Sequence, residues 1–165
     1  MERLWSPWRL SYVTGASGGD PVCVFCDALK TEPHDLILTR GRLCYAILNL
    51  YPYNGGHLMV ALNRHVGTLA ATTRDEQTEL MQLTRRAEMA LTEAYTPQGI
   101  NIGVNIGRPA GAGVLDHLHV HLVPRWNGDT NFMTVVGETR VLPEDLAQSA
   151  ARLRPIFERL ARADA

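Results

Sequence analysis

His117-Leu118-His119-Val120-His121 alternates three histidines with two apolar residues. This period of two predicts a strand over 117–123 that carries the three imidazoles on one face and apolar side chains on the other. Three polar groups on an otherwise apolar strand are costly to bury, and imidazole is the side chain best suited to change charge or attack phosphorus near neutral pH. The run therefore predicts a functional site rather than ordinary packing.

A three-histidine zinc site is the main alternative for this run. Same-face neighbours on a strand lie roughly 6.6 Å apart, which separates the outer pair by about 13 Å. Zinc needs each nitrogen within about 2.1 Å. Adjacent histidines can share one ion, but all three in a row cannot without strain. Chemistry on an anion fits the run better than a single metal.

A glycine-rich connection leads into the histidine strand and reads Gly107-Arg108-Pro109-Ala110-Gly111-Ala112-Gly113. Glycines let backbone N–H groups approach a ligand closely, and consecutive amides form an anion-binding nest. Arg108 adds a guanidinium that suits phosphate. Arg125, just beyond the strand, is either a second phosphate contact or a solvated charge at the strand end. A loop of this composition is more often a plain turn, and the adjacent histidines are what favour anion binding.

The remaining pattern predicts an α+β domain. Thr73-Arg74-Asp75-Glu76 reads as a capping box that opens a long helix ending near Tyr95. A last helix is expected from about Pro143 to Arg162. Other strands are expected at 35–39, 43–49, 57–62 and 100–106. Tight turns between them favour a mainly antiparallel sheet of about five strands, with the long central helix and the C-terminal helix on one side.

Length and composition fit a single domain over residues 1–165, with an N-terminal segment 1–34 and a C-terminal helix 143–165. The chain is 45% hydrophobic and 20% charged, with a net charge of −1. That charge gives no support for bulk binding to nucleic acid. No apolar run reaches the ~18 residues of a membrane span, and no signal-peptide core opens the chain. Three cysteines, an odd count, favour a cytoplasmic protein over a disulfide framework.

Cys23-Val24-Phe25-Cys26 is a CxxC motif without a matching second pair. The residues alone leave three readings open: a redox pair, half of a zinc site, or two ordinary cysteines. The Gly/Pro-rich loop in front of the motif argues against a thioredoxin-like pair. Zinc requires two more nitrogen or sulfur ligands, for which His65 and His117 are the natural candidates.

Taken together, these motifs resemble the histidine-triad (HIT) superfamily of nucleotide hydrolases and transferases. The resemblance is closest to a bacterial branch related to diadenosine tetraphosphate phosphorylases and hydrolases, and it spans about residues 3–143. It implies the HIT-like form of the α+β fold described above. The residues that carry it are Leu4-Trp5-Ser6-Pro7-Trp8-Arg9, the CxxC motif, Asn49-Leu50-Tyr51-Pro52-Tyr53-Asn54-Gly55-Gly56-His57, Asp116 to Trp126, and Gly128-Asp129-Thr130-Asn131-Phe132.

The resemblance assigns a catalytic role to three histidines. It makes His119 the nucleophile on the α-phosphate, through a nucleotidyl-histidine intermediate that water, orthophosphate or another acceptor resolves. His121 is then expected to contact the phosphate and assist the leaving group, with His57 as a supporting histidine. A neutral imidazole nucleophile needs its other nitrogen held by an acceptor, usually a backbone carbonyl.

Substrate contacts and a metal follow from the same resemblance. Asn49 matches the ribose ligand, while the phosphate is expected to contact Asn105 and the amides of Gly111, Ala112 and Gly113. A structural, closed zinc site is implied at Cys23, Cys26, His65 and His117. A divalent cation accompanying the polyphosphate stays open. The resemblance also implies a homodimer formed by edge-to-edge joining of sheets.

One departure from the family concerns the acceptor. Much of the superfamily carries Gln-Ser or Gln-Thr just before the triad strand, whereas this chain reads Ala112-Gly113-Val114 and has no hydroxyl there. Water and orthophosphate therefore both stay open as acceptors. The expected substrate is a dinucleoside polyphosphate, with diadenosine tetraphosphate first. The alternatives are a nucleoside phosphoramidate hydrolase, a nucleotide-binding sensor with little turnover, and a zinc-organised interaction module.

Overall fold

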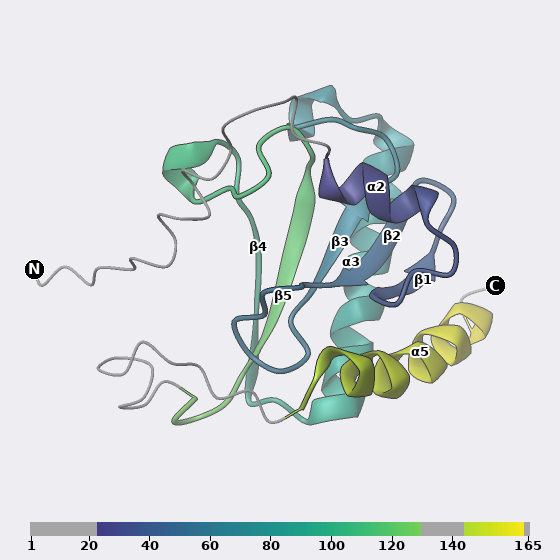
Figure 1. Ribbon diagram of the computed structural model, residues 1–165, viewed down its shortest axis with the longest axis vertical. Coiled ribbons are helices and arrows are strands. Elements are labelled where there is room, and N and C mark those ends of the chain that lie inside the picture. Colours follow the sequence, from purple (N-terminus) through teal and green to yellow (C-terminus); the bar gives the residue numbers. More distant parts are fainter. Residues whose placement is uncertain (1–22, 130–143, 164–165) are drawn as a thin grey trace, which may run out of the picture.

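The computed structural model describes residues 23–129 and 144–163. Within them, five antiparallel strands form one sheet in the order β1-β2-β3-β5-β4 (Figure 1). The predicted antiparallel α+β fold is confirmed. The strands are β1 (Ile37–Arg40), β2 (Cys44–Leu48), β3 (Leu58–Leu62), β4 (Gly99–Val104) and β5 (His119–Arg125). The helices are α2 (Val24–Lys30), α3 (Arg74–Tyr95) and α5 (Leu146–Ala163), with single 3-10 turns at Leu69–Ala71 and Arg108–Ala110.

The histidine strand begins two residues later than the sequence pattern predicts. His119 is the first residue of β5 and pairs with Ala61 of β3. His117 and Leu118 bond instead to the segment that leaves β3: Leu118 N donates to Val66 O at 2.6 Å, and the His117 ring bonds to Leu62 O at 2.7 Å. The backbone pairing between β3 and β5 therefore ends at His119, and beyond it the ring of His117, not its backbone, bonds to the last residue of β3.

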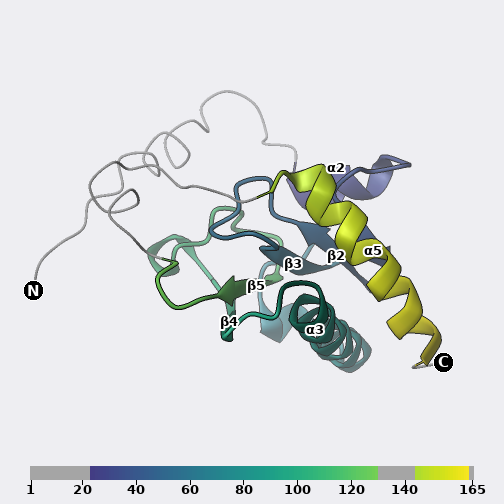
Figure 2. The ribbon, with the colours of Figure 1, turned by 90° about the horizontal axis from the view of Figure 1, so that it is seen from below.

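Helices α3 and α5 cover one face of the sheet. Val120 and Leu122 of β5, which point away from the histidines, lie in the main hydrophobic core with Leu118 just before the strand and with residues from both helices. Phe157 of α5 is fully buried there. Figure 2 shows α3 and α5 side by side against the sheet. This layer buries the apolar face of β5, so the opposite face of the strand can carry polar groups.

Helix α3 begins as the capping box predicts. The Thr73 hydroxyl accepts from Glu76 N, and the Glu76 carboxylate accepts from Thr73 N at 2.7 Å. Arg64 binds the same carboxylate through two nitrogens, at 2.9 and 2.8 Å. Hydrogen bonds from Arg64 and the Thr73 amide lower the pKa of Glu76 to about 2. The pair ties the segment that carries His65 to the start of α3.

The C-terminal helix is confirmed over Leu146–Ala163, and its expected start at Pro143 lies outside the described residues, as do Trp5, Trp8 and residues 130–132. Its buried residues include Leu153, Phe157 and Leu160. Arg154 donates to the carbonyl oxygen of Ile37 at 3.1 Å, which joins α5 to β1. In the described part of the chain, no helix combines the length and the apolar character that a bilayer span requires.

Helix α2 lies on the opposite face of the sheet, in front of β1 and β2 in Figure 1. Phe25 and Ala28 of this helix pack in a second core with Ile37, Tyr45 and Met59. The sequence pattern did not predict α2, which has seven residues between Cys23 and Thr31. Because Met59 and Ala61 pair with His121 and His119, this second core borders the histidine face of β5.

The turn before His57 packs against the end of α3. Gly56 has a φ of +76°, and a Cβ there would lie 2.7 Å from Cε2 of Tyr95. Both the backbone conformation and the close approach require glycine. The turn therefore delivers His57 to the start of β3 in a fixed position.

Candidate active site and metal centre

His119 is held by its own strand with one nitrogen free. Its Nδ1–H donates to the carbonyl oxygen of His117 at 2.8 Å, since a carbonyl only accepts. The lone pair is therefore on Nε2. The residue is 4% exposed, and burial lowers the pKa of the ring below its usual 6.5. A neutral imidazole with an unshared lone pair is the form that acts as a nucleophile.

Phe25 covers one side of this ring. Its ring centroid lies 4.6 Å from that of His119 and 5.1 Å from that of His117. Phe25 is 3% exposed, and its carbonyl oxygen accepts from the Tyr45 hydroxyl at 2.8 Å. Apart from the position of Phe25 inside the CxxC motif, no sequence pattern indicated this role. The contact places the first turn of α2 directly beside His119.

His57 and His121 form a bonded pair next to His119. Nε2 of His57 lies 3.0 Å from Nδ1 of His121, and Tyr53 N donates to Nδ1 of His57 at 3.0 Å. The ring of His121 meets that of His119 edge to face, with centroids 4.8 Å apart. Burial, followed by the electrostatic influence of the neighbouring His119, lowers the pKa of His121 to about 4. The three histidines expected to act together therefore form a row in which His121 contacts both His57 and His119.

The Tyr53 ring packs on both members of the pair, with its centroid 4.6 Å from His57 and 6.3 Å from His121. Sequence reasoning missed Tyr53. The only available signal was its place in the turn that connects Asn49 to His57, which says nothing about a contact with residue 121.

Asn49 and Asn105 lie near the histidines through the ends of their strands. Asn49 follows β2; its Oδ1 accepts from Tyr51 N at 2.9 Å, and its Nδ2 lies 3.4 Å from both ring nitrogens of His57. Asn105 follows β4, whose last residue, Val104, pairs with Val120. Asn105 therefore sits at the level of His119. Its Nδ2 donates to Gly111 O at 3.5 Å, which folds the glycine-rich loop back toward this end of β5.

The glycine-rich loop has an exposed part and a buried part. Arg108 opens the 3-10 turn and is exposed, while Gly111 ends the turn with a φ of +89°. Ala112 is 7% exposed and Gly113 is exposed. The loop therefore presents backbone groups and one guanidinium near the start of β5.

The structure does not bring Arg125 to this cluster. It lies six residues after His119, roughly 20 Å along the strand. Its guanidinium binds both oxygens of Asp129, at 2.6 and 2.8 Å, and donates to Oδ1 of Asn101 at 3.2 Å. Arg125 holds the pKa of Asp129 well below its usual range. Its interactions fix the turn after β5, at the end of the strand opposite His119.

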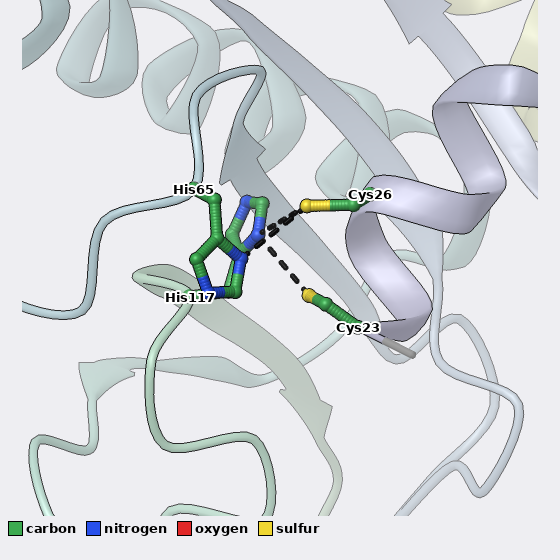
Figure 3. Close-up of side chains that lie close together, drawn as sticks. All are labelled: Cys23, Cys26, His65 and His117. Atoms are coloured by element: carbon green, nitrogen blue, oxygen red, sulfur yellow. Dashed lines mark hydrogen bonds between the residues drawn. The ribbon is translucent and has the colours of Figure 1, made fainter. Parts of the chain in front are cut away.

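Cys23, directly before α2, and Cys26 in its first turn meet His65 and His117 (Figure 3). One ligand atom from each of the four residues lies within 4.8 Å of every other. Sγ of Cys23 is 3.3 Å from Nδ1 of His117, and Sγ of Cys26 is 3.3 Å from Nδ1 of His65 and 3.5 Å from Nδ1 of His117. The grouping agrees with the ligand set that the sequence resemblance implied.

The geometry of this group fits zinc. In a tetrahedral site with Zn–S of about 2.3 Å and Zn–N of about 2.05 Å, neighbouring sulfur and nitrogen ligands stand about 3.6 Å apart. The observed separations of 3.3 and 3.5 Å are close to that value. Nε2 of His117 donates to Leu62 O, which leaves Nδ1 as a lone pair that faces the cysteines. Two thiols and two imidazoles are also the donor set that zinc prefers.

This chain is similar to known proteins in both sequence and structure. The family model described as HIT domain matches residues 30–128. The AP-4-A phosphorylase of Mycobacterium tuberculosis H37Rv is 41% identical over 152 residues, which cover 87% of this chain and 78% of that protein. The bis(5'-adenosyl)-triphosphatase of Dictyostelium discoideum is 30% identical over 122 residues, covering 70% of this chain and 81% of that one. Among solved structures, a Zn-bound histidine triad family protein from Mycobacterium smegmatis matches with a TM-score of 0.70 and 28% identity, over 88% of this chain and 99% of that chain.

Proposed function

The chain belongs to the HIT-domain family, and on that premise we propose that it cleaves dinucleoside polyphosphates, with diadenosine tetraphosphate as the first substrate to test. The observation that carries the proposal is the buried, neutral ring of His119, whose Nδ1–H is bound to a carbonyl and whose Nε2 is left as a lone pair. The substrate class is supported by the similarity to an AP-4-A phosphorylase and to a bis(5'-adenosyl)-triphosphatase.

The reaction proceeds in two steps. Nε2 of His119 attacks the α-phosphorus, the P–O bond to the rest of the polyphosphate breaks, and its electron pair leaves with the oxygen. The His119 Nδ1–H bond to His117 O stabilises the positive charge that builds up on the ring. Orthophosphate or water then attacks the nucleotidyl-histidine and frees the nitrogen. His121 lies at the site of departure because its ring contacts His119.

The substrate contacts proposed here come from both sides of β5. Asn49 binds a ribose hydroxyl; Asn105, Arg108 and the amides of residues 111–113 surround the phosphates. The bond from Asn105 to Gly111 supports this arrangement, because it holds the loop at the level of His119. Arg125 acts only on a distal part of a long substrate, since its side chain is paired with Asp129.

A structural zinc ion held by Cys23, Cys26, His65 and His117 completes the proposed site. With four protein ligands it is closed, so it supplies stability by fixing α2 to the start of β5 and takes no part in the chemistry. The chemistry of His119 needs only its own ring and the carbonyl of His117. A divalent cation bound to the polyphosphate belongs to the substrate and is varied in the assay.

We also propose a cytoplasmic homodimer. Strand β4 is one of the two edges of the described sheet, β1 being the other, and Ile102 on β4 is 47% exposed. Joining two such edges would pair their open backbone groups and cover this side chain. Free thiols at Cys23 and Cys26 are typical of a reducing compartment, which supports the cytoplasmic location. Sedimentation analysis tests the dimer, and a monomer at micromolar concentration would exclude it.

Product analysis tests the function. Metal-analysed protein is incubated with diadenosine tetraphosphate and Mg²⁺, with and without orthophosphate. ADP plus ATP formed only with orthophosphate identifies a phosphorylase, and AMP plus ATP formed without it identifies a hydrolase. Absence of both products would exclude the proposed substrate.

The matched variants are His119→Asn and His34→Asn, because His34 is a histidine outside the cluster whose Nδ1 accepts from Leu36 N. We expect His119→Asn to abolish turnover with an unchanged melting temperature, while His34→Asn retains activity. Turnover of a tenth or more in His119→Asn would remove this residue from the mechanism.

A further inference from the structure

The proton positions on His57 are set by a backbone group. Tyr53 N–H can only donate, and it points at Nδ1 of His57 from 3.0 Å. Nδ1 is therefore the acceptor, and the proton of the neutral ring is on Nε2. His57 is 1% exposed, so water does not compete for either nitrogen. Asn49 Nδ2 lies farther from both ring nitrogens, at 3.4 Å, and does not replace the shorter partners.

This arrangement fixes His121 as well. Nε2–H of His57 faces Nδ1 of His121 at 3.0 Å, so Nδ1 of His121 must accept and its proton must be on Nε2. A second proton on Nδ1 would confront the N–H of His57. Burial acts in the same direction, because it lowers the pKa of His121 to about 4. The ring of Tyr53 packs against both imidazoles and limits their rotation.

A neutral N–H donor is adequate for some leaving groups and not for others. When a phosphoanhydride breaks, the bridging oxygen keeps the electron pair and departs as a phosphate anion, which a hydrogen bond from Nε2–H of His121 stabilises without proton transfer. When a P–N bond breaks, the nitrogen must gain a proton. A neutral His121 that gave up its Nε2 proton would be left as an anionic ring. Residues 111–115 of the loop before the strand are Gly, Ala, Gly, Val and Leu, so none of their side chains can transfer a proton to this nitrogen.

We propose that the chain of hydrogen bonds Tyr53–His57–His121 determines leaving-group specificity: it restricts this site to substrates whose leaving group departs as an oxyanion, and it disfavours phosphoramidates. Tyr53 and His57 are positioning residues, since they act through His121. This inference rests on the proposed function, and it selects phosphoanhydrides within the broader set of substrates that a nucleophilic His119 can attack.

A leaving-group series tests the inference. Aryl esters of AMP are compared over a range of phenol pKa values, together with diadenosine tetraphosphate and adenosine 5'-phosphoramidate. We expect kcat/KM to fall steeply as the phenol pKa rises, and the phosphoramidate to react at least 100-fold more slowly than the tetraphosphate. A flat series, or a phosphoramidate within tenfold of the tetraphosphate, would overturn the inference and leave the His119 chemistry standing. Failure of every substrate would instead overturn the proposed function.

Two variants of His57 test the positioning role on the full protein. His57→Gln retains an N–H donor for His121 and an oxygen that accepts from Tyr53 N, whereas His57→Leu has a similar volume and neither group. We expect His57→Gln to lose only a few-fold in kcat, and His57→Leu to lose about tenfold or more with little change in KM.

The ¹⁵N spectrum of the histidine rings adds a readout that does not depend on turnover. Neutral His121 with its proton on Nε2 is expected at pH 7 in the wild type and in His57→Gln, and a mixture of tautomers in His57→Leu. A charged His121, or a proton on Nδ1 in the wild type, would refute the proposal.

Discussion

Phe25→Ala removes the ring that joins the first turn of α2 to the catalytic histidine. The side chain is 3% exposed and packs in the second core, with His117 and His119 on its other side. Deleting a buried phenylalanine ring costs about 3–5 kcal/mol, and we take the lower end because α2 is only seven residues long. For a domain of this size, a loss of about 3 kcal/mol lowers the melting temperature by about 6–12 °C.

The assay is thermal unfolding of the metal-loaded protein, followed by the pH dependence of kcat/KM. Burial lowers the pKa of His119, so opening a space beside its ring should move the acid limb of the profile toward higher pH. Val24→Ala is the matched control, because Val24 is the neighbouring residue and is 59% exposed; we expect a change within about 0.5 kcal/mol. A melting temperature within 2 °C of the wild type, with an unmoved acid limb, would refute the reasoning.

Three further outcomes are expected. Thr73→Ala removes the hydroxyl that accepts from Glu76 N, so it should lower the unfolding free energy by about 1 kcal/mol in urea titration, and an unchanged midpoint would contradict the capping role. The pKa of His121 is about 4 in the fold and 6.5 when unfolded; the unfolded chain therefore binds this proton first, and unfolding free energy should be steady above pH 7 and fall by about 2–3 kcal/mol between pH 6.5 and 4. Urea titrations that stay level across that window would count against a buried neutral ring. Cys26→Ser should reduce zinc per chain and increase amide exchange in α2, and full zinc content in elemental analysis would remove Cys26 from the metal site.

Short-range patterns in the sequence predicted most of the helices and strands of the fold. The capping box predicted the first residue of α3, because its side chains bond to the adjacent backbone. Alternating apolar residues located the strands to within one or two positions. The start of β5 was wrong by two residues because the ring of His117 bonds to Leu62, a contact between segments 55 residues apart that periodicity does not encode. Helix α2 was missed because seven residues are too few for a periodic pattern.

For the site, too, the sequence predicted some residues, and other contacts are visible only in the structure. Residue types at known spacing, with the family resemblance, grouped Cys23, Cys26, His65 and His117, and the structure brings them together. The roles of Phe25 and Tyr53 depend on ring contacts across the sheet, and a single sequence holds no record of such pairs. For Arg125 the sequence left a phosphate contact and a charge at the strand end both open, and a single sequence does not show that Asp129, four residues later, binds its guanidinium.

Both reactive imidazoles take their orientation from the main chain: His119 from the carbonyl of residue 117, and His121, through His57, from the amide of residue 53. Peptide groups persist under almost every substitution, so these two hydrogen bonds remain available whichever side chains occupy positions 117 and 53, and the Tyr53 ring adds a packing contact to them. Mutational drift in the surrounding loops can then alter what is recognised without disturbing the reacting atoms. Evolution of new specificities on this scaffold therefore starts from an aligned nucleophile, and changes in the loops around the site can alter which substrate is recognised.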